Sequence, residues 1–273
     1  MPDEKSALKN YLELAIEAAI MAGIAIMKVY NKPSFNQKLK VDNSPLTEAD
    51  TAANIIINEF LNTSNIPIIS EENKNSDYDI RKNWKKCWLV DPLDGTKEFV
   101  NKNGEFTVNI ALCENGIPIL GVIYAPNSKE LFYANVKSRN AYKRQLIEEH
   151  MIKGELYDFQ YEISPNPAPT NTIRVVGSRS HMNSETLDFI KDLKQKYDLV
   201  EIVSMGSSLK LCMIAEGKAD IYPRFAPTME WDTAAGHAIC RAVGLKVVAK
   251  NSQDELMYNK ENLLNNHFIL QNS

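Results

Sequence analysis

The chain has 273 residues, of which 44% are hydrophobic and 24% are charged, so it is long enough to bury a substantial core in one large domain or two closely packed lobes. Its formal net charge of −4 provides no basic excess, which excludes polymeric nucleic acid as a partner but leaves room for a local cationic pocket. The four cysteines lack CxxC or Cys/His ligand spacing, which argues against structural zinc and against a disulfide framework.

The first predicted element is a long amphipathic helix over residues 5–31, with Leu8, Leu12 and Ala19 on its apolar stripe. Charged residues such as Glu13 interrupt this stretch, so it fits neither a signal peptide nor a transmembrane segment. No other uncharged run is long enough to span a bilayer. We therefore expect a cytoplasmic protein, either free or peripherally associated with the inner face of the membrane, that is a monomer or a homodimer.

Two acidic motifs follow the first helix. In SPLTEADTAAN, Thr47 marks the start of a helix that carries Asp50 in its first turns, off the apolar stripe. In IPIISEEN, a short apolar strand ends in Glu71 and Glu72. For either motif taken alone, helix capping or a solvated loop explains the acidic residues without any ligand.

The most informative segment is WLVDPLDGTKEF, residues 88–99, because it joins a buried apolar run to two aspartates and then to a helix start. Asp91 and Asp94 flank a proline turn, and Gly95 and Thr96 supply backbone amides where the helix begins. Mg²⁺ is usually held by a few carboxylates together with substrate phosphates. The segment favours magnesium-dependent phosphate chemistry, whereas the alternative is an Asp-Pro turn capped by Asp94.

Strand patterns then recur near residues 86–91, 106–113, 117–125 and 130–136. Separated by short turns, they predict an antiparallel meander in an α+β lobe over residues 1–143. A variable, polar connection at 144–171 contains IEEHMIKGELYDFQYE, which we interpret as an extra helix. Alternating strands and helices then predict an α/β lobe over 172–273.

The last acidic motif is EWDTAAG, residues 230–236, which places Asp232 at the start of a helix in this second lobe. The small residues that follow let this helix approach a neighbouring backbone closely. A metal site shared by Asp91 and Asp232 requires the two lobes to meet at this helix.

Five segments together resemble a known group of enzymes: LTEAD, SEE, WLVDPLDGTKEF, GEFTVNIAL and EWDTAAG. They resemble the lithium-sensitive, magnesium-dependent phosphatases of the inositol monophosphatase superfamily, over nearly the whole chain. DGTKEF at 94–99, GSRSH at 177–181 and the segment 206–228 are most similar to its 3'(2'),5'-bisphosphate nucleotidases of the CysQ type. The resemblance implies a layered αβαβα, sugar-phosphatase-like fold, with helices between an antiparallel sheet and a mixed sheet.

The resemblance also implies a site for two or three Mg²⁺ ions. The implied ligands are Glu71, Asp91, the backbone carbonyl of Leu93, Asp94 and Asp232, with Asp91 shared between ions. Asp50 and Thr96 would orient and deprotonate the attacking water, so no covalent protein nucleophile is required. The backbone amides of Gly95 and Thr96 would hold the scissile phosphate in register with that water.

The same comparison implies the contacts to the substrate. Beside the metal site these are Glu71, Leu93, Asp94, Gly95, Thr96 and Asp232, and on the nucleotide side they are Ser178, His181, Gly206, Lys210 and Arg224. Arg224 takes the position of an acidic, sugar-binding residue in inositol monophosphatases, so Lys210 and Arg224 suit the second phosphate of a bisphosphate nucleotide. Without the resemblance, Lys210 would be assigned to a solvated helix face and His181 to a loop or cap.

Three hypotheses remain. The first is a nucleotidase that converts adenosine 3',5'-bisphosphate to AMP and phosphate, or the corresponding phosphosulfate to adenosine 5'-phosphosulfate. The second keeps the enzyme class but changes the substrate to inositol monophosphate, NADP or fructose bisphosphate. The third is a catalytically silent relative that binds a metabolite, which the complete set of acidic residues and Thr96 disfavours.

Overall fold

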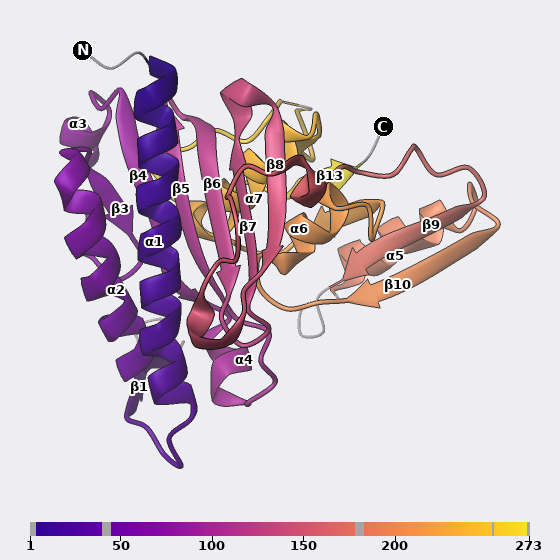
Figure 1. Cartoon of the computed structure of the whole chain (residues 1–273). Helices are drawn as coiled ribbons and strands as arrows, with labels where there is room; N and C mark the ends of the chain where they lie inside the picture. The colour runs from indigo at the N-terminus through magenta and orange to yellow at the C-terminus, as the bar shows by residue number, and fades with distance from the viewer. Residues whose placement is uncertain (1–3, 40–44, 178–182, 253, 272–273) are drawn as a thin grey trace.

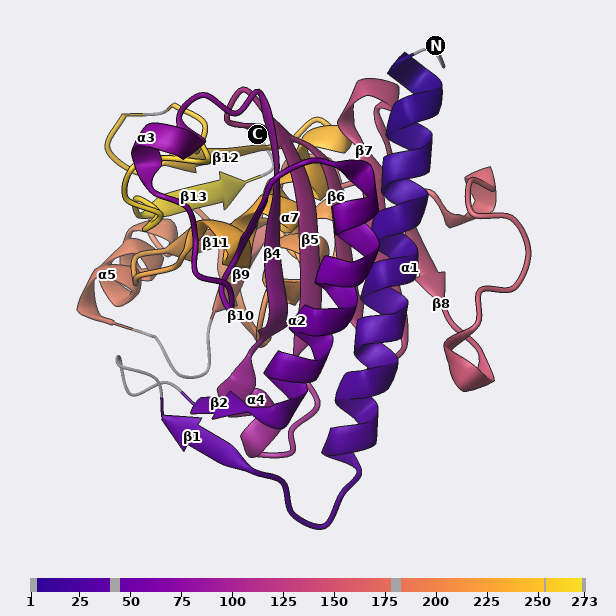
Figure 2. The same ribbon diagram turned by 90° about the vertical axis from the view of Figure 1, so that its left-hand side faces the viewer.

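The computed structural model describes residues 4–39, 45–177, 183–252 and 254–271. Layers of helix and sheet alternate through the molecule, as two views at right angles show (Figures 1 and 2). In order the layers are α1 (Glu4–Tyr30) with α2 (Glu48–Leu61), a six-stranded sheet, α6 (Leu209–Ala215) with α7 (Glu230–Ala242), a five-stranded sheet, and α5 (Ser184–Leu193). The layered αβαβα fold that the sequence predicts is confirmed.

The first sheet has the strand order β3-β4-β5-β6-β7-β8. Its strands are β3 (Ile68–Ser70), β4 (Lys86–Asp94), β5 (Thr107–Glu114), β6 (Ile117–Ala125), β7 (Glu130–Asn135) and β8 (Asn140–Gln145). β3 runs parallel to β4, and every other neighbouring pair is antiparallel. The predicted meander is confirmed, and β8 extends it by one strand.

Helices α1 and α2 cover the outer face of this sheet, where their apolar stripes meet Trp88, Tyr124 and other buried residues of the strands. Gly23 permits the close approach of α1, because a Cβ at this position would lie 2.5 Å from the Tyr124 ring. The shorter elements of this part of the chain are β1 (Gln37–Leu39), β2 (Pro45–Thr47), α3 (Tyr78–Arg81) and α4 (Thr96–Val100). Within the described ranges, no helix is both long and apolar enough to cross a membrane.

Helices α6 and α7 lie between the two sheets and make the close contacts that the small residues of EWDTAAG predict. A Cβ at Gly121 of β6 would lie 2.3 Å from the carbonyl oxygen of Ala235, and a Cβ at Gly236 would lie 2.6 Å from the side chain of Leu211. Because α7 packs tightly on β4, β5 and β6, its first turn is held beside the end of β4.

The second sheet has the order β10-β9-β11-β13-β12. Its strands are β9 (Thr172–Gly177), β10 (Leu199–Ser204), β11 (Ile221–Arg224), β12 (Lys246–Ala249) and β13 (Phe268–Gln271). β9 runs parallel to β10 and β11, whereas β13 is antiparallel to β11 and β12, so the sheet is mixed. The division of the chain into lobes at residues 143 and 171 stays a prediction.

The prediction of an extra helix within residues 144–171 is wrong. This segment contains only two short 3₁₀ turns, Glu148–His150 and Phe159–Tyr161. The guanidinium of Arg144, which is 3% exposed, donates to the backbone carbonyls of Lys153 and Glu155. The buried Arg144 side chain thus bonds two backbone carbonyls that would otherwise accept hydrogen bonds within a helix. The segment after β8 therefore does not form the expected α-helix.

Candidate active site

The two aspartates of DPLDGT lie at the end of β4, where its regular pairing with β5 is interrupted. A bulge separates Asp91 from Asp94, and within it the Leu93 amide donates to Asp91 Oδ1 at 3.0 Å. Gly95 follows with φ of +87°, a left-handed conformation in which a Cβ would lie 3.1 Å from the Glu105 carbonyl. The sequence DPLDGT therefore presents two carboxylates and one turn that requires glycine at the same sheet edge.

Four carboxylates from three elements crowd this edge. Burial raises the pKa of Asp91 well above its ordinary value, and the carboxylates of Glu71, Asp94 and Asp232 raise it further. Burial and then the Asp94 carboxylate raise the pKa of Asp232 to about 8. Carboxylates held together away from water take up a proton or a cation, so the residue after β3, the end of β4 and the start of α7 bring the predicted ligands into one acidic site.

This donor set fits a hard divalent cation by chemistry. It consists of carboxylates and the Leu93 carbonyl, which also accepts from Thr96 Oγ1 at 3.2 Å. Among the described residues, no group of three or more acidic, histidine or cysteine side chains is arranged to hold a metal ion, so the fit lies in the type of donor and not in a preformed ligand geometry. Burial and the neighbouring carboxylates raise the pKa of Asp91, and a bound cation would relieve the repulsion between these groups.

Asp50 faces this site from the first turn of α2 and is 1% exposed. Its Oδ2 accepts from the backbone amide of Thr47 at 2.8 Å and from the Thr47 hydroxyl at 2.6 Å, which forms a capping box. Its Oδ1 lies 3.4 Å from Thr96 Oγ1. The helix cap thus fixes one oxygen and directs the other towards Thr96, as the predicted pair requires.

A cavity of about 110 Å³ adjoins the acidic residues and is lined by the two predicted cationic side chains, Lys210 and Arg224. Lys210 is 6% exposed rather than solvated, and burial lowers its pKa to about 8, an effect that Asp94 partly offsets. Its Nζ donates to the Ser207 carbonyl.

Arg224 is the second cationic side chain of the cavity. It donates from Nη2 to the Pro227 carbonyl at 3.0 Å, while its buried Nε has no partner within the described part of the chain. Ser178 and His181 lie outside the described residues.

The structure adds site residues to which the sequence reading assigned no role. The Ser207 hydroxyl donates to Asp94 Oδ2 at 2.7 Å and contacts Thr107, which in turn lies 2.9 Å from Asn109 Oδ1. Glu105 Oε2 accepts from the Gly206 amide at 2.7 Å. The added residues all lie in the segments GEFTVN and GSS, which the sequence motifs had already singled out. Their contacts join residues about a hundred positions apart, and no local pattern in the sequence predicts such a pairing.

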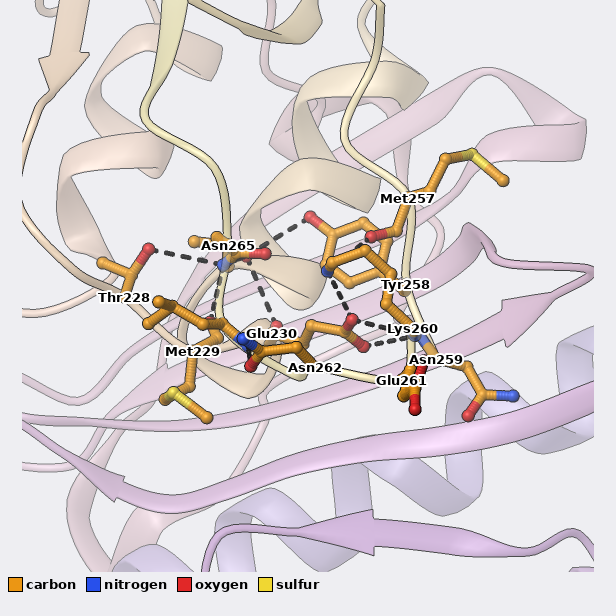
Figure 3. Close-up of polar contacts among 12 residues, drawn as sticks. Thr228, Met229, Glu230, Met257, Tyr258, Asn259, Lys260, Glu261, Asn262 and Asn265 are labelled. Atoms are coloured by element: carbon orange, nitrogen blue, oxygen red, sulfur yellow. Dashed lines mark hydrogen bonds and ion pairs between the residues drawn. The ribbon is translucent and has the colours of Figure 1, made fainter. Parts of the chain in front are cut away.

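The first turn of α7 is anchored by residues 257–265, as Figure 3 shows. Glu230 is fully buried, and its carboxylate accepts from the backbone amides of Asn259 and Lys260 and from Lys260 Nζ. Asn265 Nδ2 donates to the Met229 carbonyl at 2.7 Å. These contacts hold the helix end that carries Asp232.

Glu230→Ala should therefore lower the free energy of unfolding by about 3 kcal/mol, because it leaves two backbone amides and an ammonium without their acceptor. Urea denaturation of the metal-free protein measures the loss. Glu261→Ala removes an exposed carboxylate from the same segment and should stay within about 0.5 kcal/mol of wild type. Equal stabilities of the Glu230 variant and wild type would contradict the anchoring role.

Two sheets with helices between them, and an anionic strand end beside a cationic cavity, define a layered α/β protein of the sugar-phosphatase-like class. The sequence pattern of the inositol monophosphatase family matches residues 7–272. The chain belongs to the inositol monophosphatase family, and the resemblance inferred from its motifs is confirmed.

Among the relatives within this family, several similar ones are CysQ proteins. The chain is 48% identical over 242 residues to the 3'(2'),5'-bisphosphate nucleotidase CysQ of Buchnera aphidicola, covering 88% of this chain and 84% of that one. It is 45% identical to CysQ of Salmonella typhimurium over 86% of this chain and 89% of the relative. The crystal structure of CysQ from Bacteroides thetaiotaomicron matches with a TM-score of 0.85 and 46% identity, over 99% of this chain and 98% of that one.

Proposed function

We propose that this protein is a 3'(2'),5'-bisphosphate nucleotidase that hydrolyses the 3'-phosphate of adenosine 3',5'-bisphosphate to give AMP and phosphate. The observation that carries the proposal is the anionic cluster around Asp91 directly beside a cavity that holds Lys210 and Arg224. The acidic cluster suits metal-assisted phosphate chemistry, and the cationic cavity suits a second anionic group of the substrate. The corresponding phosphosulfate, which also has a 3'-phosphate, fits the same site. The names of the CysQ relatives support this substrate class.

Glu71, Asp91, Asp94 and Asp232, with the Leu93 carbonyl, would hold two or three Mg²⁺ ions. Bound Mg²⁺ would neutralise charge on the scissile phosphate and make a coordinated water more acidic. The protein contributes the remaining steps. Asp50 accepts a proton through Thr96 Oγ1, which lies 3.4 Å from Asp50 Oδ1, and the backbone amides of Gly95 and Thr96 hold the phosphate oxygens.

The nucleotide side would use Lys210, Arg224 and the backbone of Gly206, together with Ser178 and His181. Because the pKa of Lys210 is lowered only to about 8, most of its ammonium remains charged at pH 7. A buried ammonium in a small cavity binds an anion more strongly than the same group in water, since the local dielectric is low. This positive charge distinguishes a bisphosphate nucleotide from a sugar monophosphate.

A phosphate-release assay with a substrate panel tests the proposal. Adenosine 3',5'-bisphosphate should have the highest kcat/KM, ahead of inositol 1-phosphate, NADP and fructose bisphosphate. A preference for inositol 1-phosphate would overturn the nucleotidase assignment while leaving a metal-dependent phosphatase. Absence of turnover with every substrate, despite Mg²⁺ binding, would indicate a silent binding protein.

Lys210→Ala should raise KM for adenosine 3',5'-bisphosphate by roughly tenfold or more, because a charge-assisted contact to phosphate contributes about 1.5–3 kcal/mol. KM for inositol 1-phosphate, which lacks a second phosphate, should change far less. Lys218→Ala is a matched control, since Lys218 has a side chain that is 56% exposed beyond the end of α6. Equal losses on both substrates would make Lys210 a structural residue.

A further inference from the structure

The backbone amide of Gly206, a predicted contact on the nucleotide side, is already bonded to a carboxylate. Glu105 lies between α4 and β5, and its Oε2 accepts from the Gly206 amide at 2.7 Å. Gly206 itself is buried and begins the loop that leads into α6. A carboxylate oxygen therefore occupies a donor that an incoming phosphate oxygen would otherwise use.

The packing around Glu105 is built for this contact. A Cβ at Gly206 would lie 2.9 Å from Glu105 Cβ and 3.0 Å from its carbonyl oxygen, so only glycine lets the two backbones come this close. On the other side, the Glu105 carbonyl lies 3.1 Å from the position of a Cβ at Gly95. Glu105 thus lies between the Gly95 turn, which is proposed to hold the scissile phosphate, and the loop at Gly206 that leads into α6 and Lys210.

The charges in the cavity indicate that the Glu105 carboxylate competes with a bound phosphate for the same positive groups. Glu105 lines the same cavity of about 110 Å³ as Lys210 and Arg224. Its negative charge partly balances those cations while no substrate is bound. A second phosphate that approaches Lys210 must displace the carboxylate from the Gly206 amide or be repelled by it, because unlike charges attract and like charges repel most strongly in a small enclosed space.

We infer that Glu105 is the affinity-setting residue of the second-phosphate subsite, where its carboxylate competes with the non-scissile phosphate for the Gly206 amide and the Lys210 ammonium. This inference rests on the proposed nucleotidase function. The product AMP keeps its 5'-phosphate, so the same competition weakens product binding and speeds product release. A sugar monophosphate places its only phosphate at the acidic cluster and leaves the Glu105 contact intact.

Glu105→Gln tests the inference, because glutamine keeps an oxygen acceptor for the Gly206 amide while losing the charge. In the full-length protein with Mg²⁺, KM for adenosine 3',5'-bisphosphate and Kd for AMP should both fall, by roughly five- to tenfold. KM for inositol 1-phosphate should stay within about twofold. AMP binding is measured by calorimetry, which needs no turnover.

Glu98→Gln is the matched control, since it removes the same charge from the same cavity without bonding to Gly206. An equal fall in Kd for AMP in this variant would show a general field effect and overturn the inference. Unchanged or raised values in Glu105→Gln would overturn it as well, the latter by showing that Glu105 binds the nucleoside directly. Wild-type turnover of the bisphosphate separately tests the proposed function, whereas the ratio of variant to wild-type AMP affinity tests Glu105.

Discussion

Asp91→Asn is expected to lower kcat/KM for adenosine 3',5'-bisphosphate by roughly 10³-fold or more. Asp91 is the most enclosed of the four predicted carboxylate ligands, at 2% exposed, and it faces Glu71, Asp94 and Asp232. Bound cations contribute several kcal/mol to stabilising phosphate charge in the transition state, and each 1.36 kcal/mol is tenfold in rate. Phosphate release measured across a Mg²⁺ titration tests this expectation.

The same substitution should stabilise the metal-free fold. Burial, and then the carboxylates of Glu71, Asp94 and Asp232, hold the pKa of Asp91 above its ordinary value. Ionising such a group costs folding free energy, and the cost grows as the pH rises from the ordinary pKa to the raised one. At pH 7 without metal, Asp91→Asn should therefore melt at a higher temperature than wild type. Added Mg²⁺ should raise the Tm of wild type and leave that of the variant nearly unchanged.

Asp79→Asn serves as the control, because its side chain is 88% exposed and its charge is removed without touching the cluster. EDTA should abolish wild-type turnover, and Mg²⁺ should restore it. The family resemblance adds inhibition by Li⁺ and by competing Ca²⁺. Full turnover in EDTA, or a Mg²⁺-dependent rise in Tm that survives Asp91→Asn, would contradict the proposed metal site.

Local pattern was enough to predict the elements that carry the site. An unbroken apolar run at 87–90 can only be a buried strand or a buried helix segment, and the following Asp-Pro turn favours the strand that is observed as β4. The helix predicted to start near Thr47 is observed as α2, where Thr47 and Asp50 form a capping box. The small residues after Asp232 predicted the tight packing of α7, because only small side chains let backbones approach that closely.

Contacts between distant segments could not be predicted in this way. The burial of Lys210 arises because the second sheet closes over α6, whereas its helical position alone indicates a solvated face. The contact of Glu105 with Gly206 joins residues 101 positions apart. Residues 147–162 have helix-forming composition, but buried Arg144 captures their carbonyls, so a tertiary contact overrides local propensity.

Asp50→Asn is expected to lower kcat by roughly 10²-fold or more while KM for the bisphosphate and the affinity for Mg²⁺ stay nearly unchanged. Asp50 Oδ1 lies 3.4 Å from Thr96 Oγ1, so the carboxylate can take the proton that the Thr96 hydroxyl relays from the attacking water. Asparagine can still accept a hydrogen bond from the Thr47 amide but cannot take up that proton. Steady-state kinetics combined with Mg²⁺ calorimetry separates loss of the base from loss of metal.

Thr47→Ala distinguishes this role from helix capping. It removes the hydroxyl that caps Ala49 and that donates to Asp50, but it leaves the Asp50 carboxylate in place. Such a cap contributes about 1 kcal/mol, so this variant should lose stability and keep kcat within a few-fold of wild type. If Asp50→Asn instead kept the wild-type kcat, or if a phosphorylated enzyme could be trapped, Asp50 would not be the proton acceptor.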